Sequence, residues 1–277
     1  MIVAVDFAPG LHGHFLELVI NKYIFGIPYN KEVFQSSGAV HVINTDQVYQ
    51  SAKLANCGHY SSFEYAYPLD AQKVVFIKHA PALDIVLLTN IFYRCHPDAI
   101  SVKDFNFKEI LAVHENTIAQ GSRSDIDFRK DWFSKLTDRQ LAHPDKTPVT
   151  ELPVFDFDYS TFFDLPGFCN ELKRTSKFLN STFLFDQSLV DLWHDFIQRN
   201  QGWQLYIQSQ DLLTKTLSGV QEAIPNDWKL HACLNYHVGK LFELYDGNLH
   251  DNLVYPTTTT QLLNIITQHI KNFDLKF

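Results

Sequence analysis

A short glycine-containing loop near the start of the chain carries the first residues that could do chemistry. It has the sequence PGLHGH over residues 9–14 and joins an apolar run, residues 2–7, to a segment with helical spacing. A strand, loop and helix in this order points backbone N–H groups and the positive end of a helix dipole at an anion. A phosphate suits this arrangement, although a plain tight turn explains the same pattern. The candidate anion-binding residues are Gly10, His12, Gly13 and His14.

Two further polar groups follow runs that are dense in Val, Ile and Leu. His79 comes directly after residues 74–78, and Arg94 directly after residues 85–93, with Ser101 seven positions later. Open parallel sheets bind ligands at the carboxyl ends of their strands. A histidine there can act as a general base, because its pKa lies near neutral pH. An arginine can donate two hydrogen bonds to a phosphate, and a serine at the start of the next helix can add one more.

A metal site is the alternative interpretation of the two loop histidines, His12 and His14. Zinc requires three or four ligands, and the acidic residues nearby in sequence are Asp6 and Glu17. The four cysteines lie at least 38 residues apart and form no CxxC pair, which is typical of buried thiols in a reducing compartment. We therefore expect no metal site, and imidazoles close to phosphate oxygens instead.

Taken in order, these segments resemble the sulfotransferase family, P-loop-like enzymes that use 3′-phosphoadenosine 5′-phosphosulfate. The first loop is similar to the family's 5′-phosphosulfate loop, with Gly13 matching its glycine. The sequence KHAP resembles the family's Lys-Thr-His-Leu-Pro segment, with His79 on the catalytic histidine. Residues 94–101 resemble the 3′-phosphate segment Arg-Asn-Pro-x-Asp…Ser. The sequence NDWK, which contains Trp228, resembles the end of Arg-Lys-Gly-x-x-Gly-Asp-Trp-Lys.

The resemblance implies transfer of a sulfuryl group from the phosphosulfate donor to a hydroxyl of a small-molecule or carbohydrate acceptor. His79 would take the proton from that hydroxyl. Arg94 and Ser101 would hold the 3′-phosphate of the donor, and Trp228 would belong to the same donor site. We expect Gly13, His79 and Arg94 to line one cavity. Aromatic side chains that could stack on the acceptor are Tyr60, Phe63, Tyr65 and Tyr67.

The chain departs from the family pattern at both phosphate positions. Leu11 or His12 replaces the loop lysine, and residues 221–223 contain no basic side chain. Charge on the bridging oxygen would then be met by the loop amides and by an imidazolium from His12 or His14. The same departures favour an alternative, a non-catalytic binding or scaffold protein that keeps the fold. A phosphoryl transferase is a third alternative, disfavoured because the triphosphate loop's Lys and Ser/Thr are absent.

The strands and helices expected around these residues indicate an α/β fold. We expect a mainly parallel central sheet with helices on both faces, in one domain spanning residues 1–277, and the resemblance adds a P-loop-like sulfotransferase architecture. Residues 2–7, 74–78 and 85–93 should be neighbouring interior strands. The other predicted strands are residues 41–44 and 154–159. Helical spacing marks residues 15–24, 107–136, 168–179, 187–199 and 261–273.

Composition limits the classes of partner. The 277 residues are 45% hydrophobic and carry a net charge of −8, so the chain folds but has no overall cationic field for nucleic acid. The longest apolar stretch, residues 85–93, is far shorter than the roughly 20 residues that span a bilayer. Residues 1–6 reach an acidic side chain before the core of a signal peptide could form. We therefore expect a soluble cytoplasmic protein with no membrane or nucleic-acid partner, and the sequence leaves its oligomeric state open.

Overall fold

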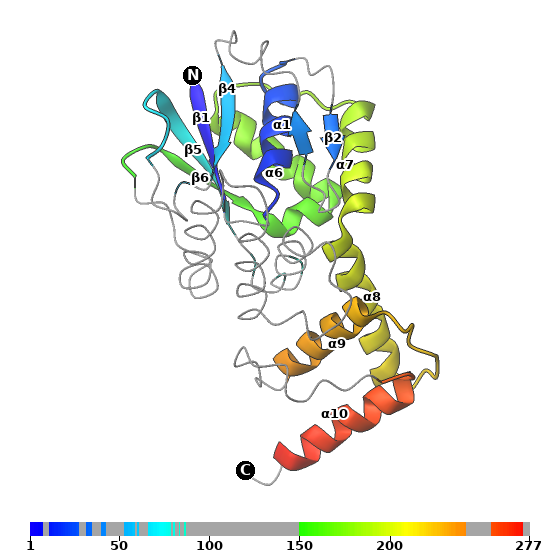
Figure 1. The fold of residues 1–277 in the computed structure, drawn as a ribbon. Helices are drawn as coiled ribbons and strands as arrows, with labels where there is room; N and C mark the ends of the chain where they lie inside the picture. The colour runs from blue at the N-terminus through cyan, green and yellow to red at the C-terminus, as the bar shows by residue number, and fades with distance from the viewer. Residues whose placement is uncertain are drawn as a thin grey trace, which may run out of the picture.

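A parallel sheet with helices packed on it precedes a group of C-terminal helices (Figure 1). The structure is a computed structural model. No helix among the described residues is long and apolar enough to cross a membrane. The residues that the structure describes are 1–7, 11–27, 32–34, 40–42, 53–58, 60, 66–78, 80, 83, 86, 150–241 and 256–273.

The main sheet has four parallel strands in the order β4-β1-β5-β6. They are β1 (Ile2–Asp6), β4 (Leu54–Gly58), β5 (Ala71–Lys78) and β6 (Val154–Asp158). Because every pair is parallel, the carboxyl ends of the strands meet at one edge. The prediction that the first run and residues 74–78 form neighbouring interior strands is confirmed, and so is a strand over most of 154–159.

Two strand predictions need correction. Residues 41–44 were expected in the parallel sheet, but β3 (Val40–Val42) pairs antiparallel with β2 (Glu32–Phe34) in a separate two-stranded sheet. A short apolar run has the same pattern in a buried parallel strand and in one strand of a short antiparallel pair, so the sequence does not distinguish them. Of residues 85–93, the structure describes Val86, whose backbone is helical rather than extended. The rest of that range, like the predicted helix over 107–136, lies outside the described residues.

Side chains of the sheet alternate between two faces, as strand geometry requires. Val5, Val75 and Phe157 belong to the large core on one face, whereas Ala4 and Val74 belong to a smaller cluster on the other. The large core also contains residues of α1 (Gly13–Tyr23), α6 (Leu165–Phe178) and α7 (Gln187–Arg199). We expected helices on both faces of the sheet. In the described part of the chain, the long helices that pack on the sheet lie on this one face.

Polar residues cap the helices that follow β6. After the 3-10 helix η3 (Tyr159–Phe163), the Asp164 carboxylate accepts a hydrogen bond from the Gly167 N–H and begins α6. The Asp186 carboxylate accepts from the Leu189 N–H and begins α7. Such caps satisfy N–H groups that have no partner within the helix. The apolar spacing predicted both helices: α7 matches residues 187–199, and α6 begins three residues before the expected 168.

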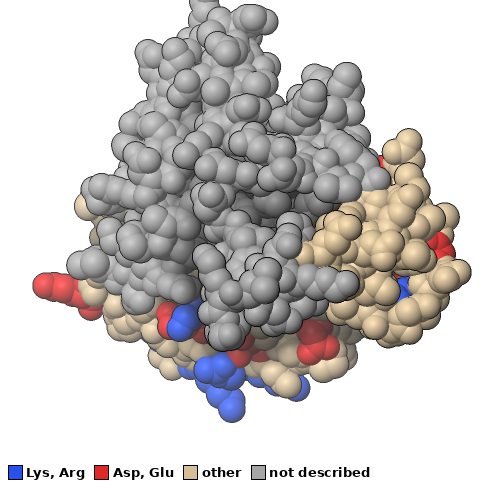
Figure 2. All heavy atoms as spheres, turned by 90° about the horizontal axis from the view of Figure 1, so that it is seen from below, with Lys and Arg blue, Asp and Glu red and all other residues tan. Residues whose placement is uncertain are grey.

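The C-terminal helices continue directly from α7 and extend away from the sheet (Figure 1). Asn200 separates α7 from α8 (Gln201–Leu217), and both α9 (Trp228–Leu241) and α10 (Thr259–Phe273) pack on α8. The predicted helix over residues 261–273 corresponds to α10. Figure 2 shows positive and negative side chains intermixed on the described part of the face that it presents.

Candidate functional site

The order of the strands defines where a ligand site should lie. The chain passes from β1 to β4 on one side and then to β5 on the other side of β1. In open α/β sheets, ligands bind in the crevice outside the carboxyl ends at the point where the strand order reverses. Asp6, Gly58 and Lys78 are the last residues of β1, β4 and β5. We call the region at these three strand ends the carboxyl edge.

Three side chains that could donate to a metal ion or move a proton converge near this edge. His14 and Glu17 lie one turn apart at the start of α1, and Cys57 is the fourth residue of β4. The Cys57 Sγ lies 3.0 Å from the His14 Nδ1 and 2.9 Å from the Glu17 Oε2. The His14 Nδ1 and the Glu17 Oε2 are 3.6 Å apart. We call these three residues the edge triad.

The Cys57 thiol is electrostatically held in its protonated form. Burial raises its pKa well above the ordinary value, and the Glu17 carboxylate raises the pKa further. The thiol therefore donates its hydrogen bond to the Glu17 Oε2. Because the thiolate is the nucleophilic form, Cys57 in this state is not poised for covalent catalysis.

A second polar group lies on the opposite face of the same edge. Asp6 is fully buried, and its Oδ2 accepts a hydrogen bond of 2.8 Å from the Tyr67 hydroxyl. Burial, and then the charge of Asp6, raise the pKa of Tyr67. The Tyr60 ring lies 5.0 Å from the Tyr67 ring and packs over Gly58, where an added Cβ would lie 2.7 Å from the Tyr60 Cζ. Of the four aromatic residues expected near the acceptor, Tyr60 and Tyr67 are thus at the carboxyl edge, and Phe63 and Tyr65 lie outside the described residues.

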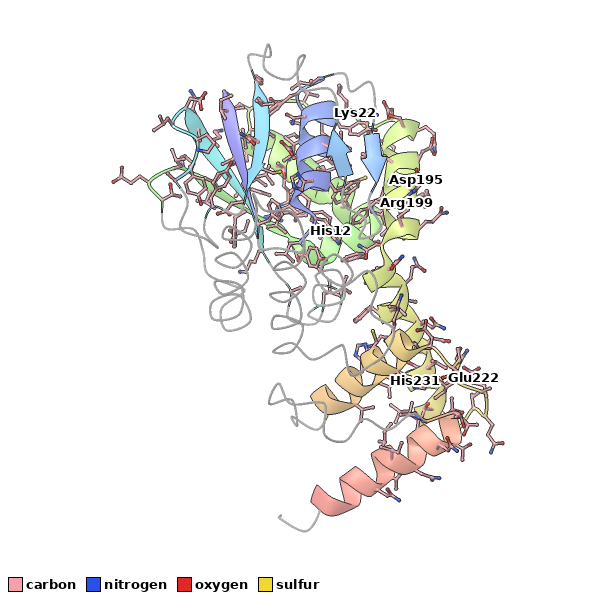
Figure 3. All side chains as sticks on the ribbon, viewed as in Figure 1. His12, Lys22, Asp195, Arg199, Glu222 and His231 are labelled. Atoms are coloured by element: carbon pink, nitrogen blue, oxygen red, sulfur yellow. The ribbon has the colours of Figure 1, made fainter. Side chains whose placement is uncertain are left out.

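His12 lies within the buried core. Its side chain is buried, and its ring lies 4.9 Å from the Phe196 ring and is stacked on Tyr159. Burial lowers its pKa to about 3, so the imidazole is neutral at physiological pH. The expectation of an imidazolium from His12 is therefore wrong. Figure 3 shows His12 at the N-terminal end of α1.

The hydrogen bond of His12 also defines which ring nitrogen carries the proton. The Asn200 Oδ1 accepts from the Trp203 N–H, so the Asn200 Nδ2 is the donor that lies 2.8 Å from the His12 Nε2. The His12 Nε2 must then be the unprotonated nitrogen. Protonating it would place two donors against each other. This hydrogen bond thus joins His12, the residue before α1, to Asn200, whose side chain caps α8.

Gly13 has a packing role that the sequence did not reveal. A Cβ at this position would overlap three atoms of the buried Phe7 ring at well under 3.0 Å. Glycine therefore lets the Phe7 ring approach the first turn of α1. The same ring meets the His14 ring edge-on, with centroids 5.9 Å apart. Of the loop residues, His14 remains at the carboxyl edge, where its Nδ1 faces Cys57.

The other predicted site residues fall in different places. Four of them, Gly10, His79, Arg94 and Ser101, lie outside the described residues. The cavity expected between Gly13, His79 and Arg94 therefore stays a prediction. Trp228 is the first residue of α9, in the C-terminal group of helices that stands apart from the sheet in Figure 1. Local spacing in the sequence does not reveal a third ligand beside His14 and Glu17, because Cys57 joins them from 40 residues further along the chain.

Comparison of the chain with known protein families, with curated proteins and with solved structures found no match.

Proposed function

We propose that the protein is a sulfotransferase-like enzyme that binds 3′-phosphoadenosine 5′-phosphosulfate at the carboxyl edge. The observation that supports this most is the position of β1 beside β5, both interior and parallel. Because the two strands are parallel, their carboxyl ends lie at the same edge of the sheet, at the point where the strand order reverses. Two segments of the resemblance, the first loop and His79, follow these two strands in the sequence.

The proposed reaction breaks the bond between the donor's phosphate oxygen and sulfur, and forms one between the acceptor oxygen and the same sulfur. His79 accepts the proton of the acceptor hydroxyl, and adenosine 3′,5′-bisphosphate leaves. Because His12 is neutral, it supplies no positive charge to the donor, whereas Lys78, which is exposed at the end of β5, can supply one. The Tyr60 and Tyr67 rings offer an aromatic surface for the acceptor.

A non-catalytic binding or scaffold protein is the second candidate, and the state of His12 favours it. The family pattern places a lysine in this loop, whereas His12 is buried and has a pKa of about 3. A loop without that cation holds an anionic donor less tightly. Such a protein would keep the α/β fold and the carboxyl edge while lacking transfer activity.

Calorimetric titration of the full chain with adenosine 3′,5′-bisphosphate separates the two candidates. We expect micromolar binding that falls in Lys78→Ala and stays unchanged in Lys53→Ala, because Lys53 precedes β4 at the opposite edge. Arg94→Ala should lose about 2 kcal/mol of binding free energy if Arg94 pairs with a phosphate. His79→Ala should retain binding but lose transfer of labelled sulfate to a phenol or a sugar. Absence of nucleotide binding in the wild type would refute the enzyme and leave the scaffold.

A further inference from the structure

We propose that the edge triad, His14, Glu17 and Cys57, is a zinc-binding site with one coordination position left for an oxygen ligand. This inference does not rest on the proposed sulfotransferase function. Nitrogen, carboxylate oxygen and sulfur are the three donor types that zinc uses in proteins. One atom of each type converges here, and all three lie within 4.8 Å of one another.

The distances within the triad are close to those between ligands of one tetrahedral ion. Zn–N and Zn–O bonds of about 2.0–2.1 Å and Zn–S bonds of about 2.3 Å place neighbouring ligand atoms roughly 3.4–3.6 Å apart. The distance from the His14 Nδ1 to the Glu17 Oε2 is 3.6 Å. The two distances from the Cys57 Sγ, 3.0 Å and 2.9 Å, are those of hydrogen bonds and need to lengthen by several tenths of an ångström.

The backbone around the triad is held in place by packing and hydrogen bonds. His14 and Glu17 are three residues apart on α1, so they lie on one face of the helix. Cys57 is held by the pairing of β4 with β1. Two residues before it, the buried Asn21 side chain of α1 accepts from the Ala55 N–H at 2.7 Å and donates to the Ala55 C=O at 2.9 Å. Helix and strand therefore keep a constant separation at the triad.

Charge and access both suit a divalent cation. Zinc binding would displace the proton of the Cys57 thiol to solvent, and the resulting thiolate and the Glu17 carboxylate would balance the two charges of Zn²⁺ when His14 binds as the neutral imidazole. The side chains of His14 and Glu17 are 36% and 22% exposed, so an ion can enter from solvent. A mixture of one sulfur, one nitrogen and one oxygen favours zinc over magnesium and calcium, which prefer oxygen ligands alone.

Three protein ligands with one position open are typical of zinc ions that act on a substrate, whereas structural ions have four protein ligands. The triad lies at the end of β4, on the edge where the strand order predicts ligand binding. The chemical class expected at the open position is an oxygen ligand, namely water, a hydroxyl or a carbonyl.

Cobalt substitution of the full chain tests the site directly, because a Co²⁺ ion bound by a thiolate shows a charge-transfer absorption in the near ultraviolet. We expect this absorption in the wild type and in Cys169→Ser, whose altered cysteine is a buried free thiol of α6 far from the triad in sequence. Cys57→Ser should abolish it. Loss of the absorption in Cys169→Ser and its persistence in Cys57→Ser would overturn the assignment.

Equilibrium dialysis against Zn²⁺ supplies an independent readout. One ion per chain should bind in the wild type, and Glu17→Gln, which keeps the shape of the side chain, should weaken binding at least about tenfold. Zinc should also raise the melting temperature of the wild type, since a ligand that binds the folded state stabilises it. If Glu17→Gln, shown by circular dichroism to be folded, binds zinc as tightly as the wild type, the triad is a hydrogen-bonded cluster only.

Discussion

Replacing Gly13 with alanine should destabilise the protein, although alanine is the better helix former. Gly13 is the first residue of α1, and Gly→Ala within a helix usually stabilises by up to about 1 kcal/mol. Here the new Cβ would overlap three atoms of the Phe7 ring. That ring is 4% exposed and packed in the large core, so it cannot swing out to solvent without losing its burial.

The size of the effect follows from two opposing contributions. Forcing an extra methyl group into a packed core costs about 1–3 kcal/mol, occasionally more, which exceeds the gain in helix propensity. We expect a net loss of about 1–2 kcal/mol in the free energy of unfolding. Phe7→Ala alone should cost about 3–5 kcal/mol, because it leaves a cavity. The double variant should lose less than the sum of the two, because the new methyl group occupies part of that cavity.

Equilibrium urea denaturation followed by circular dichroism measures all four proteins of this double-mutant cycle. An interaction energy of about 2 kcal/mol between the positions would identify the Phe7 contact as the reason for glycine. Losses that simply add, or a Gly13→Ala variant more stable than the wild type, would refute the packing argument. The requirement for glycine would then lie in the approach of a ligand to the backbone.

Two further predictions concern α1 and α9. Asn21→Leu should lower the free energy of unfolding by about 2–5 kcal/mol in urea denaturation, because it leaves the buried N–H and C=O of Ala55 unpaired, whereas Leu at the exposed Asn170 should change it little. Burial lowers the pKa of His237, which Gln210 contacts, to about 4 from 6.5. At His237 the unfolded chain therefore binds more protons between pH 6.5 and 4, and this residue should contribute a loss of stability of at most about 3 kcal/mol as pH falls through that window. The difference in urea midpoint between pH 7 and pH 5 should be smaller in His237→Gln, and an equal difference would contradict the assignment.

The elements with strong local patterns could be predicted from the sequence. The density of Val and Ile predicted β1 and the second half of β5, and apolar residues at helical spacing predicted α7. The strand β4 has the sequence LANCG, which carries little apolar signal because α1 and β1 supply its burial and pairing. A strand of this kind is determined by tertiary contacts, which a local pattern does not contain.

The candidate site shows the same limit more sharply. His12 and His14 stand two positions apart and received the same role from the sequence. His12 precedes the first turn of α1 with φ of 58° and turns into the core, whereas His14 lies within that turn and contacts Cys57. One backbone residue in the left-handed region therefore separates a neutral core histidine from a histidine at the carboxyl edge. No spacing rule could have assigned them differently.

Alternation along the strands divides the carboxyl edge into two chemically different halves. Cys57 faces α1 and the two other triad residues, whereas Asp6, paired with the residue after Cys57, faces Tyr67 on the opposite side of the sheet. Because the sheet lies between the halves, a change in one should leave the other intact. Cys57→Ser should abolish the cobalt absorption, and Lys78→Ala should weaken nucleotide binding without altering the absorption. A loss of the absorption in Lys78→Ala would mean that metal and nucleotide share one site that crosses the edge.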